Sequence, residues 1–408
     1  MVERNRVPSI RFKGFTGDWE QRKLSELIIE YKETVDSDCI LPVLTSSKTE
    51  GVVLQEDHFG RKQQHDITGY NILPRNYCTY RNRSDGVDFT FNINKCCSKG
   101  IISKFYPVFY GNASDIFFIS LVLNNSNEVV KEIGYTCTGT GQKVLSFLDL
   151  LKMKIRVPSY DEQRKVSSCF EQIDNLITFH QRKYDKLLNV KKAMLKKMFP
   201  KEGEKVPEIR FKGFIDDWEQ NKLIDVTDRI IVGLATSVTP YYRDSGVPLL
   251  RNMNIKENHL DDSDILYLDE KYAKANESKM IHANDVLTVH TGSNIGLTCI
   301  TPEKYEGCLS FTTLITTPNK NTLDSLFLMQ YMNSTLGKKK IEAIITAGGK
   351  PNLNSGDLEK FEVVHPNIDE QHEVGKFFQN LDNLIVLQKH KVEKLKNIKI
   401  AMLKKMFV

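Results

Sequence analysis

The side chains best suited to recognising a ligand through hydrogen bonds lie in short polar stretches rich in Arg, Lys, Asn and Gln. One of them is RNRSDG, which begins at Arg81, and another is GRKQQH, which begins at Gly60. Arg pairs with guanine through two hydrogen bonds, and Asn or Gln pairs with adenine in the same way, so these stretches have the chemistry to read base edges. Taken singly, each stretch is more typical of ordinary solvated surface. The candidate contact residues are Arg61, Lys62, Gln63, Arg81, Asn82, Arg83, Gln142, Lys143, Arg251, Asn252, Thr291, Ser293, Asn294, Lys350 and Asn352.

Sequence motifs that carry out catalysis are absent. The sequence has no Asn/Asp-Pro-Pro-aromatic tetrapeptide, no GxxxxGK[ST] phosphate loop and no Pro-Asp followed by Glu-x-Lys. The nine histidines do not cluster with carboxylates at metal-ligand spacing, and the eight cysteines include no CxxC pair. We therefore expect no catalytic residue, no metal site and reduced thiols.

The polar stretches lie in two variable regions, residues 25–145 and 224–353, whose flanks are similar and whose centres differ. Alternating apolar and polar residues from Val87 to Ile93 predict a half-buried strand. VPLLRNMNI from Val247 and DVLTVHTG from Asp285 also predict strands. Each region is therefore expected to form a mixed α/β domain, and the differing centres indicate two related recognition domains with different targets.

Two pairs of repeated segments flank these regions. IRFKGFTGDWEQRKL from Ile10 matches IRFKGFIDDWEQNKL from Ile209 at twelve of fifteen positions. Asp161–Phe199 matches Asp369–Phe407 at 21 of 39 positions. The chain is therefore a duplication of two half-molecules, and we expect a pseudo-twofold monomer.

Each member of the second pair is predicted to be one long helix. Ser159 with Glu162, and Asn367 with Glu370, resemble capping boxes at the helix starts. Apolar residues then recur at the 4,3 spacing of a coiled-coil seam, which predicts that the two helices pack against each other, antiparallel. The expected coiled-coil and partner-docking residues are Phe170, Ile177, Tyr184, Met194 and Met198 in the first helix and Phe378, Ile385, Val392, Met402 and Met406 in the second.

Polar residues interrupt this seam at equivalent places, His180 with Gln388 and Lys191 with Lys399. They either fix the register of the helices or extend their polar ends out of the seam edge. The identical endings AMLKKMF are expected to pack on the chain's own domains and, secondarily, to offer two equivalent surfaces to two copies of a partner. The aromatic residues of the first repeat, such as Trp19, are expected to fasten each domain to the helices.

The overall composition is that of a protein that folds in water. Of 408 residues, 40% are hydrophobic and 27% charged, and the longest apolar run, IFFISLVL from Ile116, is too short to span a bilayer. No signal segment is recognisable at the start. We therefore expect a cytoplasmic protein with no membrane partner. The net charge of +5 is by itself weak support for a nucleic-acid partner.

The repeated segments resemble those of a known family. The openings FKGF…WEQ.KL, the DL…P…EQ entries into the helices and the KKMF endings are similar to motifs of the specificity subunit of type I restriction–modification enzymes, over the whole chain. The expected fold class is therefore α+β, with two mixed α/β target-recognition domains separated by two long antiparallel helices that form a coiled coil. The expected boundaries are 1–158 for the first domain, 159–199 for the first spacer helix, 200–366 for the linker and second domain, and 367–408 for the second spacer helix.

The resemblance implies that each domain reads one half of an asymmetric bipartite site in double-stranded DNA. It also implies that the helices set the spacing and seat two modification subunits, which bind S-adenosylmethionine and methylate adenine. Restriction subunits translocate and cleave. This chain would then be non-catalytic and would bind no cofactor itself.

Two other functions remain open. A coiled-coil scaffold that binds protein partners would lack the steep salt dependence that counterion release gives to DNA binding. A self-sufficient nuclease or methyltransferase is disfavoured by the missing motifs.

Overall fold

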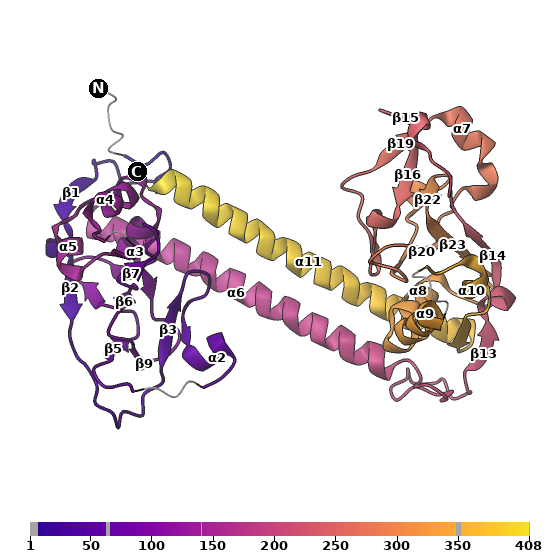
Figure 1. The fold of residues 1–408 in the computed structure, drawn as a ribbon, viewed down its shortest axis with the longest axis horizontal. Coiled ribbons are helices and arrows are strands. Elements are labelled where there is room, and N and C mark those ends of the chain that lie inside the picture. The colour runs from indigo at the N-terminus through magenta and orange to yellow at the C-terminus, as the bar shows by residue number, and fades with distance from the viewer. Residues whose placement is uncertain (1–6, 63–65, 140, 348–351, 408) are drawn as a thin grey trace. The chain divides into compact units, whose positions relative to one another are not determined.

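The computed structural model describes residues 7–62, 66–139, 141–347 and 352–407. The chain divides into two compact units: unit 1 contains Met1–Phe179 and Lys391–Val408, and unit 2 contains His180–His390. Two long helices, α6 (Tyr160–Lys197) and α11 (Ile368–Met406), contribute a part to each unit (Figure 1). Both lie inside the ranges predicted for spacer helices.

Unit 1 is built from short antiparallel strands and small helices beside parts of α6 and α11. Its largest sheet has four strands in the order β2-β10-β6-β8, and two-stranded ladders pair β1 with β12, β3 with β4, β5 with β9 and β7 with β11. The strands are β1 (Glu20–Lys23), β2 (Ile28–Tyr31), β3 (Leu44–Ser47), β4 (Gly51–Leu54), β5 (Asn71–Pro74), β6 (Cys78–Thr79), β7 (Arg83–Ser84), β8 (Asn92–Ile93), β9 (Lys99–Ile102), β10 (Val108–Gly111), β11 (Lys143–Val144) and β12 (Lys154–Val157). The helices are α1 (Leu24–Leu27), α2 (Gln55–Phe59), α3 (Ile116–Asn125), α4 (Asn127–Thr136) and α5 (Phe147–Lys152).

Unit 2 has two four-stranded sheets, in the orders β14-β23-β20-β21 and β15-β19-β16-β22, and the ladders β13-β24 and β17-β18. In Figure 1, α7, β15 and β19 lie at one end of this unit, and α8 lies near α11. The strands are β13 (Glu219–Lys222), β14 (Thr227–Val232), β15 (Tyr242–Arg243), β16 (Val247–Arg251), β17 (Ile255–Lys256), β18 (His259–Leu260), β19 (Leu266–Leu268), β20 (Val286–Val289), β21 (Thr298–Ile300), β22 (Leu309–Phe311), β23 (Thr313–Pro318) and β24 (Glu362–His365). The helices are α7 (Glu270–Ala275), α8 (Ser325–Asn333), α9 (Thr335–Ala347) and α10 (Ser355–Glu359), with 3-10 turns η1 (Leu223–Val226), η2 (Thr239–Tyr241), η3 (Asn252–Asn254), η4 (Glu277–Lys279) and η5 (Glu303–Tyr305).

One strand prediction was wrong. The alternating stretch from Val87 to Ile93 is irregular except for β8, which contains only Asn92 and Ile93. Phe89 and Phe91 are nevertheless buried, and both rings pack against the ring of Tyr80. These two aromatic residues are therefore buried through ring packing, which does not require the hydrogen bonds of a strand, whereas Val87 is 42% exposed. The strands predicted from Val247 and Asp285 are confirmed as β16 and β20.

The first repeat binds the start of each long helix through a buried ion pair. In unit 1, the guanidinium of Arg11 donates to both carboxylate oxygens of Glu162, each at 2.6 Å. In unit 2, Arg210 donates in the same way to Glu370, each at 2.7 Å. The two glutamates had been predicted to close capping boxes with backbone amides. Their carboxylates accept from arginines, because a charged bidentate partner forms a stronger hydrogen bond than a neutral amide. The other half of the predicted box is present at α11, where the side chain of Asn367 accepts from the backbone N–H of Glu370 at 3.0 Å.

The end of each long helix is inserted into an aromatic cluster. In unit 1, the ring of Phe407 lies 6.3 Å from Trp19, 5.9 Å from Phe118 and 6.2 Å from Phe170, measured between centroids. In unit 2, Phe199 makes the corresponding contacts with rings that include Trp218, Phe327 and Phe378. These contacts confirm that the AMLKKMF endings pack on the chain's own domains and that Trp19 fastens domain to helix.

Polar pairs fix the alignment of α6 and α11 within each unit. In unit 1, Lys399 donates to Asp174 at 2.6 Å. In unit 2, Lys191 donates to Asp382, and His180 contacts the side-chain oxygen of Gln388 at 2.7 Å. In unit 2, His180 pairs with Gln388 and Lys191 with Asp382, so the residue numbers run in opposite directions along the two helices. In unit 1, the pairs Phe170–Phe407 and Asp174–Lys399 show the same order. The helices are therefore antiparallel in each unit. Because the polar breaks have specific partners, these contacts favour a register-fixing role over simple extension into solvent.

We predict that Arg11→Ala destabilises unit 1 by about 3–5 kcal/mol, because it leaves the carboxylate of Glu162 buried without its partner. That carboxylate is 1% exposed. The measurement is hydrogen exchange of peptides from unit 1, with peptides from unit 2 as an internal reference. Arg22→Ala, which breaks the exposed pair with Glu26, is the control and should cost less than about 1 kcal/mol. Similar losses for both variants would contradict a special role for the buried pair.

Candidate nucleic-acid interface

The β7–β11 ladder of unit 1 brings two of the predicted polar stretches together. Its register places Lys143 opposite Ser84 and Val144 opposite Arg83. The backbone of Gly139 has a φ of +101°, and a side chain there would collide with the carbonyl oxygen of Gln142 at 2.3 Å. Glycine is therefore required at this turn, which returns the chain to the strand that faces Arg83.

Beside this ladder lies a cavity of about 460 Å³ with cations on its wall. Lys48, Arg81 and Arg83 line it together with Asp85 and Asp88. Hydroxyl groups complete a lining that can donate to phosphate or to base edges. The remaining lining residues are Ser46, Ser84, Gly86, Phe89, Thr90 and Tyr106.

Contacts inside this cluster hold its charged groups in defined positions. The guanidinium of Arg83 lies over the ring of Phe105, 4.6 Å from its centroid, which leaves its edge N–H groups available to a ligand. Lys48 donates to the carboxylate of Asp88, and the hydroxyl of Ser84 donates to the same group at 3.0 Å. Hydrogen bonds from Lys48 and Ser84 hold the pKa of Asp88 below its ordinary value.

The other candidates in unit 1 are placed differently. Gln142 is exposed and donates to Asp85 at 3.4 Å. The side-chain oxygen of Asn82 is buried, so Asn82 turns inward between two exposed arginines. Arg61 and Lys62 are exposed after α2 and do not line the cavity. Gln63 lies outside the described residues.

In unit 2, Asn252, Thr291 and Asn352 come together. The amide of Asn252 donates to the backbone oxygen of Thr291 at 3.1 Å, and Thr291 forms an antiparallel bridge with Asn352. This cluster joins η3 to the loop between β20 and β21 and to the segment before α10. Ser293 and Asn294 are exposed in that same β20–β21 loop, whereas Lys350 lies outside the described residues.

Arg251 is adjacent to this cluster, but its guanidinium is engaged within the unit. It donates to both the backbone and the carboxylate oxygen of Asp264, each at 2.8 Å. The side chain is 20% exposed. Any contact of Arg251 with a ligand therefore requires sharing or breaking an existing ion pair.

Sequence reasoning missed three residues of these clusters. Lys48 is one cation in a Ser/Thr-rich stretch, and Phe105 and Met253 are apolar, so residue type and spacing gave no signal. Lys48 lines the cavity of unit 1, and Phe105 supports Arg83. Met253 is 52% exposed within η3, between Asn252 and Asn254.

The predicted docking residues on the helices are mostly enclosed. Six of the ten are buried within their own unit: Phe170, Met198, Phe378, Ile385, Val392 and Met406. Burial contradicts a docking role for these six and fits their coiled-coil role, because each seam side chain packs against the chain itself. The other four, Ile177, Tyr184, Met194 and Met402, are half-buried.

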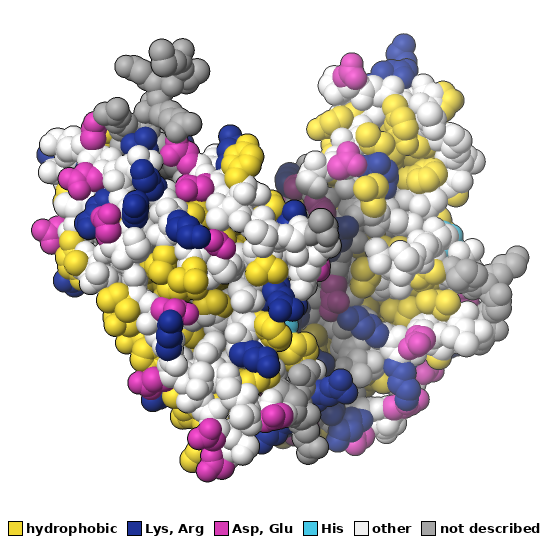
Figure 2. Space-filling view, turned by 60° about the vertical axis from the view of Figure 1, so that its left-hand side comes forward, with side chains coloured by type: hydrophobic (Ala, Val, Ile, Leu, Met, Phe, Trp, Pro, Cys, Tyr) yellow, Lys and Arg dark blue, Asp and Glu magenta, His cyan; other side chains and the backbone are white. Residues whose placement is uncertain are grey.

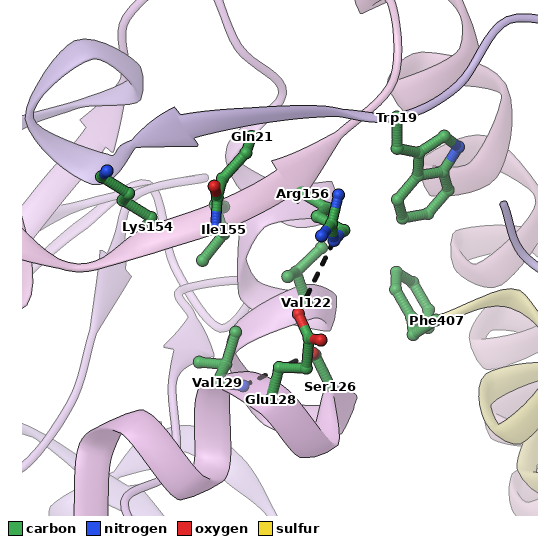
Figure 3. A pocket seen from close by; sticks show the side chains of 10 residues that line it. All are labelled: Trp19, Gln21, Val122, Ser126, Glu128, Val129, Lys154, Ile155, Arg156 and Phe407. Carbon is green, nitrogen blue, oxygen red and sulfur yellow. Dashed lines mark hydrogen bonds and ion pairs between the residues drawn. The ribbon is translucent and has the colours of Figure 1, made fainter. Parts of the chain in front are cut away.

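Basic groups gather in small clusters on the visible surface. In the face drawn in Figure 2, Lys and Arg side chains are interspersed with Asp and Glu. A further cavity, whose lining includes Trp19, Phe407 and Val122, has a volume of about 10 Å³, enough for one water molecule (Figure 3). Its wall carries an ion pair between Arg156 and Glu128, 3.7 Å apart. The cavity is therefore too small for an organic ligand.

The described part of the chain has neither a metal-binding cluster nor a membrane-spanning helix. Among residues 7–62, 66–139, 141–347 and 352–407, no group of three or more His, Cys, Asp or Glu side chains is arranged to hold a metal ion. Over the same ranges, no helix is long and apolar enough to cross a membrane.

The family model described as "Type I restriction modification DNA specificity domain" matches residues 17–189 and 215–397. The chain belongs to this family. The two matches include both clusters of candidate residues and most of both long helices, so the family unit occurs twice, as the repeats predict.

A relative in Methanocaldococcus jannaschii, the putative type I restriction enzyme MjaX specificity subunit, is 24% identical over 263 residues. The match covers 63% of this chain and 59% of the relative, so the chain spans about 59% of the length of that protein. The S subunit of a type I restriction–modification system from M. genitalium has a similar fold, with a TM-score of 0.58, 13% identity and coverage of 98% of this chain and 99% of that one.

A chain from a structural study of complex assembly and conformational transition of the type I R-M system is also similar. Its TM-score is 0.50 at 16% identity, and the match covers 96% of this chain and 98% of that chain. At these identities the two solved structures support the fold of the family.

Proposed function

We propose that this protein is the DNA-recognition subunit of a type I restriction–modification complex, in which each domain reads one half of an asymmetric bipartite site. The observation that carries the proposal is the pair of clusters built on a repeated framework. Unit 1 gathers Lys48, Arg81 and Arg83, whereas unit 2 gathers Asn252, Thr291 and Asn352. Similar frameworks with different polar side chains suit two readers of different sequences.

In unit 1, Arg83 is assigned to a base contact and Lys48 to a phosphate contact. Arg83, supported on the ring of Phe105, offers a guanidinium in a fixed plane, which is the geometry that pairs with guanine through two hydrogen bonds. Lys48 is a flexible point charge that suits a phosphate. Asp88 already accepts a hydrogen bond from Lys48, so a DNA phosphate must compete with Asp88 for Lys48. This competition disfavours binding to DNA that makes no base contact with the protein.

In unit 2, hydroxyl and amide groups replace the arginines. Thr291 and Asn352 lie on neighbouring segments that are bridged through the backbone, so their spacing is set by that bridge. Asn pairs with adenine, and Thr pairs with several bases or with phosphate. The second half-site is therefore expected to depend less on charge than the first.

The chain itself contributes recognition and no chemistry in this proposal. S-adenosylmethionine is bound by the modification subunits, which methylate adenine, and restriction subunits translocate and cleave the DNA. The assembly works in the cytoplasm. The competing scaffold function predicts binding that is insensitive to salt, whereas contacts of Lys48 and neighbouring cations with phosphates release counterions and make DNA binding fall steeply with salt.

Two equivalent surfaces on the long helices suit two modification subunits. On α6, Leu176 and Phe179 are 46% and 59% exposed, and on α11 the corresponding Leu384 and Leu387 are 43% and 47% exposed. Residues three apart lie on one face of a helix, so each pair forms a small apolar patch. The two patches are offset by 208 residues in the sequence, the same offset that relates the repeated helix segments, so they are equivalent surfaces. One type of partner can therefore bind both.

Exchange of residues 25–145 for the matching region of another family member tests the central proposal. We expect the first half-site to change and the second to stay the same, because the recognition residues of the two units belong to separate cores. The measurement is a map of methylated adenines in cells that express the exchanged chain with its modification partner. A simultaneous change of both half-sites would refute separate readers, and salt-insensitive association without DNA preference would favour the scaffold.

We predict that Arg83→Ala lowers the preference for a guanine in the first half-site by about 1–3 kcal/mol, as loss of a bidentate contact does. Binding of the complex with modification subunits is measured on duplexes in which each base pair of that half-site is changed in turn. Arg164→Ala, an exposed cation on α6, is the matched control and should leave the preference unchanged. Equal weakening on specific and random DNA would instead make Arg83 a phosphate contact.

We predict that Leu176→Lys removes one of two modification subunits and that Leu384→Lys removes the other, because a charge in an apolar contact must be desolvated without a partner. Native mass spectrometry of the assembled complex counts the subunits. Leu148→Lys, at a 69% exposed position on α5, is the control and should retain both. Retention of both partners by the double variant would place the docking surface elsewhere.

A further inference from the structure

The segment Arg251–Asn254 in unit 2 is held rigidly from both ends. At its start, Arg251 donates to the backbone and carboxylate oxygens of Asp264. At its end, Asn254 is 2% exposed, and its amide donates to the backbone oxygens of Asp261 at 2.9 Å and Asp264 at 3.1 Å. The side-chain oxygen of Asn254 also accepts from the backbone N–H of Arg251 at 2.9 Å, which closes the turn.

Asn252 points inward and is engaged by neighbouring loops. Its amide donates to the backbone oxygen of Thr291 at 3.1 Å and to the hydroxyl of Thr312 at 3.2 Å. Thr312 has a φ of 52°, an uncommon backbone conformation for a β-branched residue. Such conformations persist where the surroundings enforce them and are frequent at functional sites. Asn252 is therefore a positioning residue that locks η3 onto this strained turn.

Met253 is the one residue of the four whose side chain projects from this locked segment. It is 52% exposed, although it is a large apolar group, while both of its neighbours are fixed by hydrogen bonds. The backbone that carries it cannot turn the side chain inward without breaking those bonds. Met253 thus presents an apolar group to solvent at the residue next to Asn252, whose amide contacts Thr291, and this group is accessible to a ligand.

The first domain has a corresponding turn in its own recognition cluster. Val43 follows Pro42 and pairs in parallel with Ile101, as Leu249 follows Pro248 and pairs in parallel with Leu309. In unit 1 the chain then continues as β3 (Leu44–Ser47). The residue after β3 is Lys48, which lines the cavity with Arg81 and Arg83. Counted from Pro42 and Pro248, the position of Met253 corresponds to Ser47, and the cation Lys48 comes one residue later.

We propose that Met253 contacts the 5-methyl group of a thymine in the second half-site and thereby selects that base. This inference rests on the proposed function. The thymine methyl is the one apolar group that base edges present in the major groove, and a projecting side chain can reach it there. The adaptable thioether side chain suits close packing on a methyl group. The amide of Asn252 is of a type that pairs with adenine, but it already donates to Thr291 and Thr312. We therefore assign the base contact to Met253.

The test removes each partner of the contact in turn. Each thymine of the mapped second half-site is replaced by deoxyuridine, which lacks only the methyl group, and binding of the complex with modification subunits is measured for wild type, Met253→Ala and Met253→Leu. We expect wild type to lose about fivefold at one thymine, roughly the value of one buried methyl group. Met253→Ala should show the same loss on thymine DNA and no further loss on deoxyuridine, whereas Met253→Leu should retain the discrimination. Ile215→Ala, at an 86% exposed position in the same unit, is the control and should behave as wild type.

Other outcomes overturn the inference and leave the proposed function standing. A wild-type preference for the half-site that Met253→Ala does not change would show that Met253 takes no part in recognition. Weakening by Met253→Ala that does not depend on any thymine methyl would indicate insertion between base pairs instead. A second half-site without thymine on either strand would also overturn it. Only a wild-type complex with no sequence preference would count against the proposed function itself.

Discussion

The buried pairing of an arginine with the first-turn glutamate of each long helix is the constraint on which the arrangement of each unit depends. The carboxylates of Glu162 and Glu370 are 1% and 0% exposed, so each must keep its arginine or remain as an unpaired buried charge. Arg11 and Arg210 come from the same repeated segment, which also carries the tryptophan that packs on the end of the other helix. One short sequence therefore joins a helix start and a helix end to its domain. This explains why the segment is repeated almost unchanged.

Fixed helix ends give the recognition loops a rigid base. Phe407 and Phe199 enter the cores of unit 1 and unit 2, respectively, so the helices belong to the same packed cores as the sheets. Along the seam, Lys399 with Asp174 and Lys191 with Asp382 restrict each helix pair to one alignment. A helix that slid by one turn would break these ion pairs and withdraw an aromatic ring from its core. The variable loops can change their residues because the framework does not depend on them.

The two clusters proposed to read DNA are built with different chemistry. In unit 1, the charged groups are positioned by one another: Arg83 rests on Phe105, and Lys48 and Ser84 hold Asp88. In unit 2, the polar groups of Asn252 and Arg251 are engaged inside the unit, Thr291 and Asn352 are half-buried, and Met253 is exposed. Residue type alone therefore does not distinguish a residue that contacts the ligand from one that holds the contacting residue in place.

The sequence by itself determined the duplication, both long helices, the β16 and β20 strands and the family, because these depend on repeats and on the regular spacing of apolar residues. It also placed polar candidates in loops of both units, and their contacts with a ligand stay a prediction. Only the tertiary structure decided which candidates lie together. The strand of Arg83 pairs with the strand of Lys143. Lys48 lines the same cavity as Arg83, whereas Arg61 does not line it. It also paired the glutamates of the expected capping boxes with arginines, while Asn367 still caps α11, and it replaced the strand from Val87 by aromatic packing. The physical reason is that these outcomes depend on contacts between residues far apart in the chain, and neither periodicity nor residue type encodes the distance between two loops.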